Sequence, residues 1–231
     1  MLCSDLMDIA FCAAAFGSPQ YLLQLDRCRE SVLKIYPDAD LFFWRDVLPP
    51  GARPHYASPY GFKIHAINAA RAAGFRKVVW LDAAIILVDR LDYYQTIIPQ
   101  YGMIAATDIT QLETVVSDAA ITYMNLTRDD LITREMHLVG GSFYYFDFDV
   151  NEQIFETWAA MEAADLFYSV QSSHRHDEAC LALALYAAGS GPTPYEVCRY
   201  NTDLENPDRP PGAVDTAITI KRHFKNGYWI T

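Results

Sequence analysis

Short continuous apolar runs alternate with amphipathic segments along the first half of the chain. Each apolar run is bounded by polar or turn-forming residues, a pattern that is typical of buried strands in an α/β sheet. The segments between them place apolar side chains at helical spacing, and Gly74 suits the C-terminal cap of the second one. The predicted strands span residues 8–15, 41–44 and 78–81, and the predicted helices span residues 21–36 and 63–74.

The second half of the chain continues with both kinds of element. A strand with alternating aromatics is predicted at residues 141–148, helices at 152–164 and 177–188, and a short last strand at 217–220. Residues 108–134 have weak periodicity and several polar side chains, which favours a mobile insertion. The element order predicts an α/β fold, with a mixed, mainly parallel sheet flanked by helices. No repeat or linker interrupts residues 1–231, so we expect a single domain.

Composition narrows the class of protein. Hydrophobic residues make up 52% and charged residues 20%, which indicates a globular chain, and the net charge of -11 argues against non-specific nucleic-acid binding. The five cysteines are odd in number and form no CxxC pair, so neither a disulfide framework nor a structural zinc site is expected. No apolar stretch approaches about 18 residues, so no membrane span is expected. The first residues lack a signal-peptide pattern, and a cytoplasmic setting is the simplest interpretation.

Asp82 is the first candidate for chemistry, because it directly follows the apolar run of residues 78–81. Open α/β sheets bind ligands at the carboxyl ends of their strands, so this position predicts a functional acid. A carboxylate there can coordinate a divalent metal on a diphosphate or hydrogen-bond a ribose. The alternative interpretation is a helix or turn cap.

The succession of helix, glycine and a strand that ends in Asp resembles the nucleotide-sugar glycosyltransferases of GT-A fold. Their signature is a strand ending in Asp-x-Asp, preceded by a helix that opens with a Lys, here Lys63. In this chain the triplet is Asp82-Ala83-Ala84, so the second acid is missing. The resemblance implies a GT-A (Rossmann-like) domain, a nucleotide-sugar donor, with a UDP-sugar as the expected one, and a glycan or other hydroxyl acceptor. It also implies Mn²⁺ or Mg²⁺ as a cofactor, bound weakly because Ala84 replaces a ligand.

Three ionisable residues, His176, Asp177 and Glu178, open an otherwise apolar predicted helix. The segment resembles the His-Asp-Glu-Ser-His-Leu-Asn stretch of the blood-group A/B and α-1,3-galactosyltransferase family, although Cys180 and Ala182 replace its second His and its Asn. That resemblance gives Glu178 the role of nucleophile or stabilising carboxylate. The Asp-Gln of glycogenin-type enzymes points to the same pair, Asp177 and Glu178. Acids that only cap the helix are the alternative.

The two resembling families act with retention of anomeric configuration, so retention is favoured. An inverting enzyme would instead use Asp177 or Glu178 as a general base.

Gly140 and Gly141 precede the aromatic strand, and paired glycines allow a close approach of backbone to a ligand. They resemble the Gly-Gly-Phe-Phe stretch of the blood-group family and the Asn-Ser-Gly of glycogenin. The resemblance implies that Gly140, Gly141 and His176 lie on the acceptor side. A plain turn into the strand is the alternative.

The end of the chain, residues 221–229, resembles the His-Phe-x-Gly-x-x-Lys-Pro-Trp tail of glycogenin-type enzymes. The resemblance makes His223 a metal ligand beside Asp82 and makes Lys225 a contact of the diphosphate. Lys225 lies too close to His223 for an exact match, and no Pro precedes Trp229. Cations there can stabilise a leaving diphosphate. A solvated basic terminus is the alternative.

The loop after the first predicted strand lies on the nucleotide side of a GT-A fold. Ala14 leaves room for a base, and Phe16 or Tyr21 is placed to stack on it. The loop lacks the Gly-rich run with Arg and Lys of a sugar-phosphate nucleotidyltransferase, which disfavours that activity. A degenerate transferase that binds nucleotide or glycan without turnover stays open, because Ala84 supports it.

Overall fold

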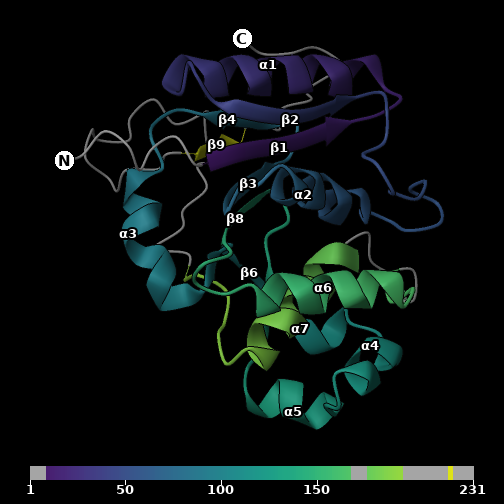
Figure 1. Cartoon of the computed structure of the whole chain (residues 1–231). Coiled ribbons are helices and arrows are strands. Elements are labelled where there is room, and N and C mark those ends of the chain that lie inside the picture. The colour runs from purple at the N-terminus through teal and green to yellow at the C-terminus, as the bar shows by residue number, and fades with distance from the viewer. Residues whose placement is uncertain (1–8, 168–175, 195–217, 221–231) are drawn as a thin grey trace, which may run out of the picture.

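A five-stranded sheet forms the centre of the computed structural model, which describes residues 9–167, 176–194 and 218–220 (Figure 1). The strand order is β2-β1-β3-β8-β5. β1 pairs in parallel with β2 and β3, whereas β8 is antiparallel to both β3 and β5. Only β8 therefore runs against the others, which confirms the predicted mixed, mainly parallel sheet. The strands are β1 Ile9–Ala15, β2 Asp40–Arg45, β3 Lys77–Leu81, β5 Met103–Ile104 and β8 Phe143–Asp147.

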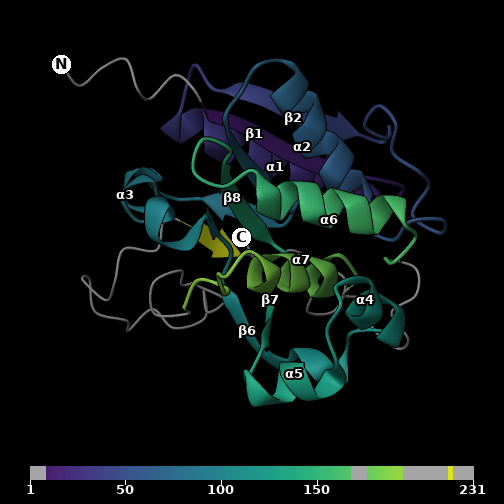
Figure 2. The ribbon, with the colours of Figure 1, turned by 60° about the horizontal axis from the view of Figure 1, so that its bottom comes forward.

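Helices cover both faces of this sheet, as predicted (Figures 1 and 2). Side chains of α1 and α3 pack with one set of strand residues, among them Val79, and side chains of α2, α6 and α7 pack with the other set, among them Trp80. The alternation follows from the two-residue period of a strand. The helices are α1 Pro19–Ile35, α2 Phe62–Ala72, α3 Asp92–Tyr101, α6 Gln153–Ala163 and α7 His176–Ala187.

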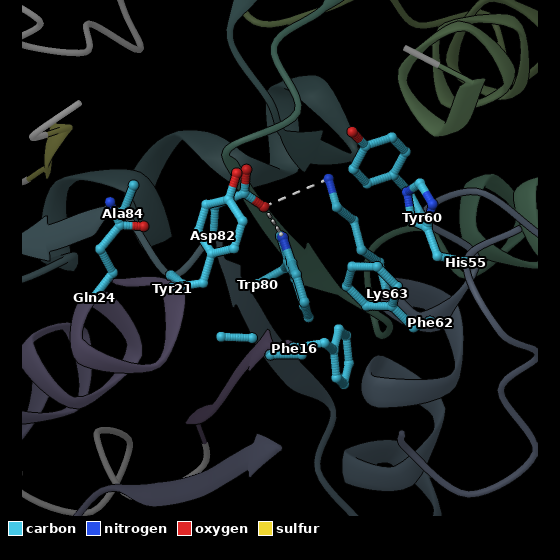
Figure 3. A pocket seen from close by; sticks show the side chains of 13 residues that line it. Phe16, Tyr21, Gln24, His55, Tyr60, Phe62, Lys63, Trp80, Asp82 and Ala84 are labelled. Atoms are coloured by element: carbon cyan, nitrogen blue, oxygen red, sulfur yellow. Dashed lines mark hydrogen bonds and ion pairs between the residues drawn. The ribbon is translucent and has the colours of Figure 1, made fainter. Parts of the chain in front are cut away.

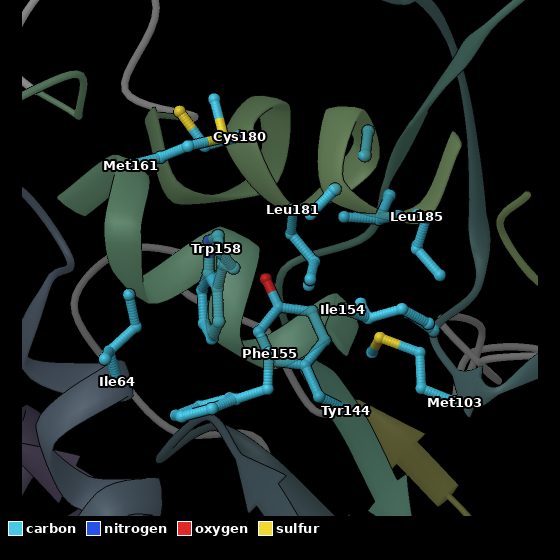
Figure 4. Close-up of a cluster of buried hydrophobic side chains, with 14 of the residues drawn as sticks. Ile64, Met103, Tyr144, Ile154, Phe155, Trp158, Met161, Cys180, Leu181 and Leu185 are labelled. Carbon is cyan, nitrogen blue, oxygen red and sulfur yellow. The ribbon is translucent and has the colours of Figure 1, made fainter. Parts of the chain in front are cut away.

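The larger core lies between α6, α7 and the β8 side of the sheet (Figure 4). Trp158 is fully buried and meets Tyr144 edge-on, with ring centroids 5.6 Å apart. Its indole Nε1 donates a hydrogen bond to the backbone oxygen of Asp177 at 3.0 Å. The core therefore fixes where α7 begins, and with it the acids of its first turn.

The segment expected to be a mobile insertion has regular structure instead. Its two short helices are capped by side chains, and Thr127 and Asp130 form a complete capping box at the second one. Leu112 and Leu131 are fully buried, which anchors the segment to the core. Helices of six residues are too short to produce a periodic pattern, so no clear signal for them is visible in the sequence. The elements are β6 Thr107–Gln111, η1 Leu112–Thr114, α4 Asp118–Tyr123, α5 Arg128–Thr133 and β7 His137–Val139.

A further antiparallel pair joins β4 Ile85–Leu87 to β9 Ile218–Ile220. β4 follows β3 after the triplet of Asp82, Ala83 and Ala84, so the triplet forms the connection between two strands. Within the described ranges, no helix is long and apolar enough to cross a membrane.

Candidate active site

A cleft of about 830 Å³ opens where β1 and β3 end (Figure 3). Four segments supply its walls: the end of β1 with the start of α1, the loop before α2, the start of α2, and the end of β3. This is the sheet edge at which open α/β folds bind ligands. The lining residues are Ala14, Ala15, Phe16, Tyr21, Gln24, His55, Tyr60, Phe62, Lys63, Trp80, Asp82, Ala83 and Ala84.

Asp82 is held at this edge from several sides. Its backbone N–H donates to Ser142 O at 2.9 Å, and its backbone oxygen accepts from Ile85 N at 2.8 Å. The Trp80 indole Nε1 donates to Asp82 Oδ1 at 2.9 Å. The Asp82 side chain is 26% exposed, so a ligand in the cleft can reach it.

Lys63 connects the cleft to the acids of α7. Its side chain is 3% exposed, and Nζ lies 2.7 Å from Asp177 Oδ2 and 3.5 Å from Asp82 Oδ1. The ammonium also donates to Gly141 O at 2.8 Å. Burial by itself lowers the pKa of Lys63, but Asp177, Asp82 and Glu178 more than offset it, so the pKa lies above its usual value. Lys63 is therefore a charged junction between three segments that are distant in sequence.

The two acids of the first turn of α7 have different surroundings. Asp177 is 1% exposed, and its Oδ2 accepts a hydrogen bond from the Tyr144 hydroxyl at 3.2 Å in addition to the Lys63 contact. A carboxylate with this burial and these partners serves as the counter-ion of the buried Lys63 ammonium. Glu178 is only partly buried, and it acts electrostatically on both Lys63 and Tyr60, which line the cleft.

Gly141 allows Glu178 to pack against the backbone. A Cβ atom at Gly141 would lie 2.1 Å from Glu178 Oε1, a distance that requires one of the two groups to move. The close backbone approach that the paired glycines predict is therefore present, but the group that approaches is a protein carboxylate. The predicted acceptor contact of Gly140, Gly141 and His176 stays a prediction.

Tyr60 forms a wall of the cleft from an unusual backbone conformation. Its φ is 61°, which is rare for a bulky side chain and costs on the order of 1–3 kcal/mol. Its ring meets His55 edge-on at 4.7 Å between centroids, and Lys63 Nζ lies 5.5 Å from its centroid. Burial first, then Asp177, raises the pKa of the Tyr60 hydroxyl above its usual value, so the group is neutral at physiological pH.

A buried carboxylate on α6 holds the loop that carries Tyr60. Glu162 is 5% exposed, accepts from Ser58 Oγ at 2.5 Å and pairs with Arg53 Nη2 at 2.6 Å. His65 Nε2 lies 3.7 Å from the other carboxylate oxygen. Although burial raises the pKa of Glu162, these three partners lower it to about 2. The loop is thus fixed to the helix layer behind the cleft.

The residues described at the cleft do not fit a tightly held divalent cation. Ala84 offers no side-chain ligand, and Asp82 Oδ1 already accepts from Trp80 and lies near Lys63. Within the described ranges no group of three or more His, Cys, Asp or Glu residues is arranged to hold a metal ion.

The structure brings most of the predicted donor-side residues together in the cleft, and the predicted acids lie next to it, across Lys63, rather than in its lining. The predicted residues that line the cleft are Ala14, Phe16, Tyr21, Lys63, Asp82 and Ala84. Those outside its lining are Gly140, Gly141, His176, Asp177 and Glu178. Two predicted residues, His223 and Lys225, lie outside the described part of the chain.

Several lining residues were not predicted from the sequence. Gln24 lies three positions after Tyr21 on α1, so helical spacing from Tyr21 was an available signal. Tyr60 lies three positions before Lys63, but its backbone conformation has no signature in the sequence. His55 has no metal-ligand spacing to any other histidine, so the sequence contains no signal for it.

Comparison with known proteins finds a similar fold among solved structures. No protein-family model matches the sequence, and no curated protein is significantly similar to it. A glycosyltransferase involved in the glycosylation of the major capsid of PBCV-1 matches with a TM-score of 0.55 at 8% identity, over 94% of each chain. The galactosyltransferase LgtC matches over 93% of this chain and 86% of its own at 12% identity, but its TM-score of 0.47 adds no weight. This chain therefore has the α/β fold of a GT-A-type glycosyltransferase, the fold that its sequence predicts.

Proposed function

We propose that this protein is a glycosyltransferase that moves a sugar from a nucleotide-sugar, a UDP-sugar in the first instance, to a hydroxyl of a glycan or other acceptor. The fold supports the reaction class. The single observation that carries the proposal is the Lys63 junction, which joins the strand-end acid Asp82 in the cleft to the acids that open α7. A donor bound along the cleft would have its nucleoside near Tyr21 and its diphosphate near Asp82.

Glu178 is the acid that we assign to the reaction centre. In a retaining transfer the C1–O bond to the diphosphate breaks, the diphosphate leaves with the electron pair, and the acceptor oxygen bonds to C1 while its proton passes to the departing diphosphate. A carboxylate on the opposite face acts as nucleophile or stabilises the oxocarbenium-like state. Asp177 is committed to Lys63 and Tyr144, whereas Glu178 is more exposed and influences the cleft-lining Tyr60.

We further propose that activity depends only weakly on a divalent cation. Mn²⁺ or Mg²⁺ prefers several oxygen ligands, and with Ala84 in the triplet the described cleft offers the carboxylate of Asp82 alone. His223 stays a predicted second ligand. No catalytic step in this proposal passes through the metal.

Calorimetry with UDP and a panel of UDP-sugars, on the wild type and on Asp82→Ala, tests the donor site. We expect binding in the wild type and at least a tenfold loss, about 1.4 kcal/mol, in Asp82→Ala. Equal affinity in the two proteins would remove Asp82 from the site. Two assays then test turnover. One measures the release of free sugar by donor hydrolysis, and the other measures the transfer of the sugar to a panel of glycans.

A binding module without turnover is the second candidate. Two observations favour it: Ala84 in the triplet and the commitment of Asp177 to a buried ion pair. The same experiment separates the candidates, because a module would bind the nucleotide-sugar while neither transferring nor hydrolysing it over days.

A further inference from the structure

Gln24 is a buried polar side chain that faces the cleft and has no hydrogen-bond partner among the residues that the structure describes. It is 3% exposed, it lines the cleft, and its carboxamide makes no hydrogen bond to any residue within the described ranges. A carboxamide can donate two hydrogen bonds and accept two. A polar side chain that lines a cleft in this way is available to a ligand or to water.

The position of Gln24 on α1 relates it to the predicted base-stacking residue. Tyr21 and Gln24 are three residues apart, so they lie on the same face of the helix, about 5–6 Å apart at their Cβ atoms. Both line the cleft. A nucleoside whose base stacks on Tyr21 would therefore bring its ribose next to Gln24.

The opposite side of this part of the cleft is the triplet that follows β3. α1 packs along β4, where Leu87 N donates to Ser31 Oγ at 3.0 Å, and this contact fixes the helix against the strand that follows the triplet. Figure 3 shows the Gln24 carboxamide at the end of the cleft where Ala84 and Tyr21 lie. An acid at position 84 would offer the amide a partner, whereas the methyl group of Ala84 offers none.

We propose that Gln24 binds the ribose of the nucleotide donor through the 2′- and 3′-hydroxyls, an inference that rests on the proposed function. A vicinal diol both donates and accepts hydrogen bonds, and so does a carboxamide. A carboxamide is uncharged and therefore needs no cation beside it. This suits a cleft whose triplet has lost an acid and with it a ligand for a metal ion. Gln24 is then a specificity residue that distinguishes ribonucleotides from deoxynucleotides.

The test is calorimetry in EDTA with two probes, UDP and 2′,3′-dideoxy-UDP, on the wild type and on Gln24→Met. Methionine keeps the approximate volume and removes the hydrogen bonds. We expect UDP affinity to fall about three- to tenfold in Gln24→Met, because one or two net hydrogen bonds are lost. The affinity for the dideoxy probe should change by less than about twofold.

A matched control is Gln20→Met, because Gln20 is exposed on α1 and does not line the cleft. It should change neither affinity. Because the Gln24 amide has no hydrogen bond to lose within the described part of the chain, Gln24→Met should unfold at the wild-type temperature or above it. If Gln24→Met does not fold, Gln24→Asn withdraws the amide by one methylene and should give the same selective loss.

Two results would overturn the inference: an unchanged UDP affinity in Gln24→Met, or an equal loss for UDP and the dideoxy probe, which indicates a packing effect. Failure of the proposed function has a different signature, since the wild type would then bind neither probe.

Discussion

Lys63 and Asp177 form a buried ion pair, with 2.7 Å between Nζ and Oδ2, and their side chains are 3% and 2% exposed. The pair joins the first turn of α2 to the first turn of α7, and the same ammonium reaches Asp82 in the cleft. A charge buried to this degree is tolerated only with its partner in place. Lys63 therefore holds the cleft and the first turn of α7 in a fixed relative position.

Lys63→Met should destabilise the fold by about 3–5 kcal/mol, because it leaves the Asp177 carboxylate buried without its cation. Urea unfolding measures this change. In the double variant Lys63→Met/Asp177→Asn the loss should be smaller than the sum of the two single losses, because the uncompensated charge is gone. Strictly additive losses would show that the two side chains are not energetically coupled.

Glu178→Gln should reduce turnover, or slow donor hydrolysis, on the order of a hundredfold or more, because the negative charge at the reaction centre is lost. Nucleotide affinity should stay nearly unchanged. Asp177→Asn is the comparison variant, and its main effect should be on the free energy of unfolding. If Glu178→Gln keeps nearly full activity while a folded Asp177→Asn is inactive, the catalytic acid is Asp177 and the assignment here is wrong.

Gly141→Ala should impair activity by displacing Glu178, since the added Cβ would lie 2.1 Å from Oε1 and 2.8 Å from Cδ. We expect lower turnover with nucleotide affinity within about twofold of the wild type. The matched control is Gly191→Ala, where the nearest atom, Tyr186 Cε1, would lie at an ordinary 3.5 Å. Wild-type turnover in Gly141→Ala would mean that the position of Glu178 does not matter to the reaction.

Ala84→Asp should make nucleotide binding respond to Mn²⁺. The variant places a second carboxylate beside Asp82 in the cleft, and hard cations bind more tightly as oxygen ligands are added. Titrating UDP into the variant and the wild type, each with Mn²⁺ and with EDTA, measures the response. An unchanged metal response would show that residue 84 does not face the phosphates and that the triplet is wrongly aligned with Asp-x-Asp.

Glu162 should make the stability depend on acid pH. Its pKa is lowered from 4.5 to about 2 in the folded protein, where burial opposes and the contacts with His65, Ser58 and Arg53 outweigh it. A lowered pKa gives stability that is present above the unfolded pKa and is lost as the pH falls through the folded one. For a shift of this size the contribution is on the order of 3 kcal/mol at neutral pH.

The measurement is the free energy of unfolding of the wild type and Glu162→Gln between about pH 5 and pH 2. The wild type should lose more stability over this range than the variant. Glu156→Gln, an exposed position on the same helix, is the control and should follow the wild-type profile. Parallel profiles for the wild type and Glu162→Gln would show that Glu162 contributes no pH-dependent stability.

Local patterns were sufficient for the sheet, because each of its first three strands is a continuous apolar run between turn signals. They also place Asp82 correctly, since the residue after a buried strand lies at the edge where such sheets bind ligands. Residues 108–134 were misjudged, because their short helices depend on capping and on a few buried anchors such as Leu112 and Leu131.

By itself, the sequence determined the α/β class, the strand-end acid and the candidate acids at the start of α7, because periodicity and strand ends are local properties. Only the tertiary structure decided what those acids touch. It paired Asp177 with Lys63, placed Glu178 against Gly141, and buried Gln24 in the cleft wall. Such contacts depend on which helices meet across the sheet, and the free energy of a buried charge or amide is set by neighbours that are distant in the chain.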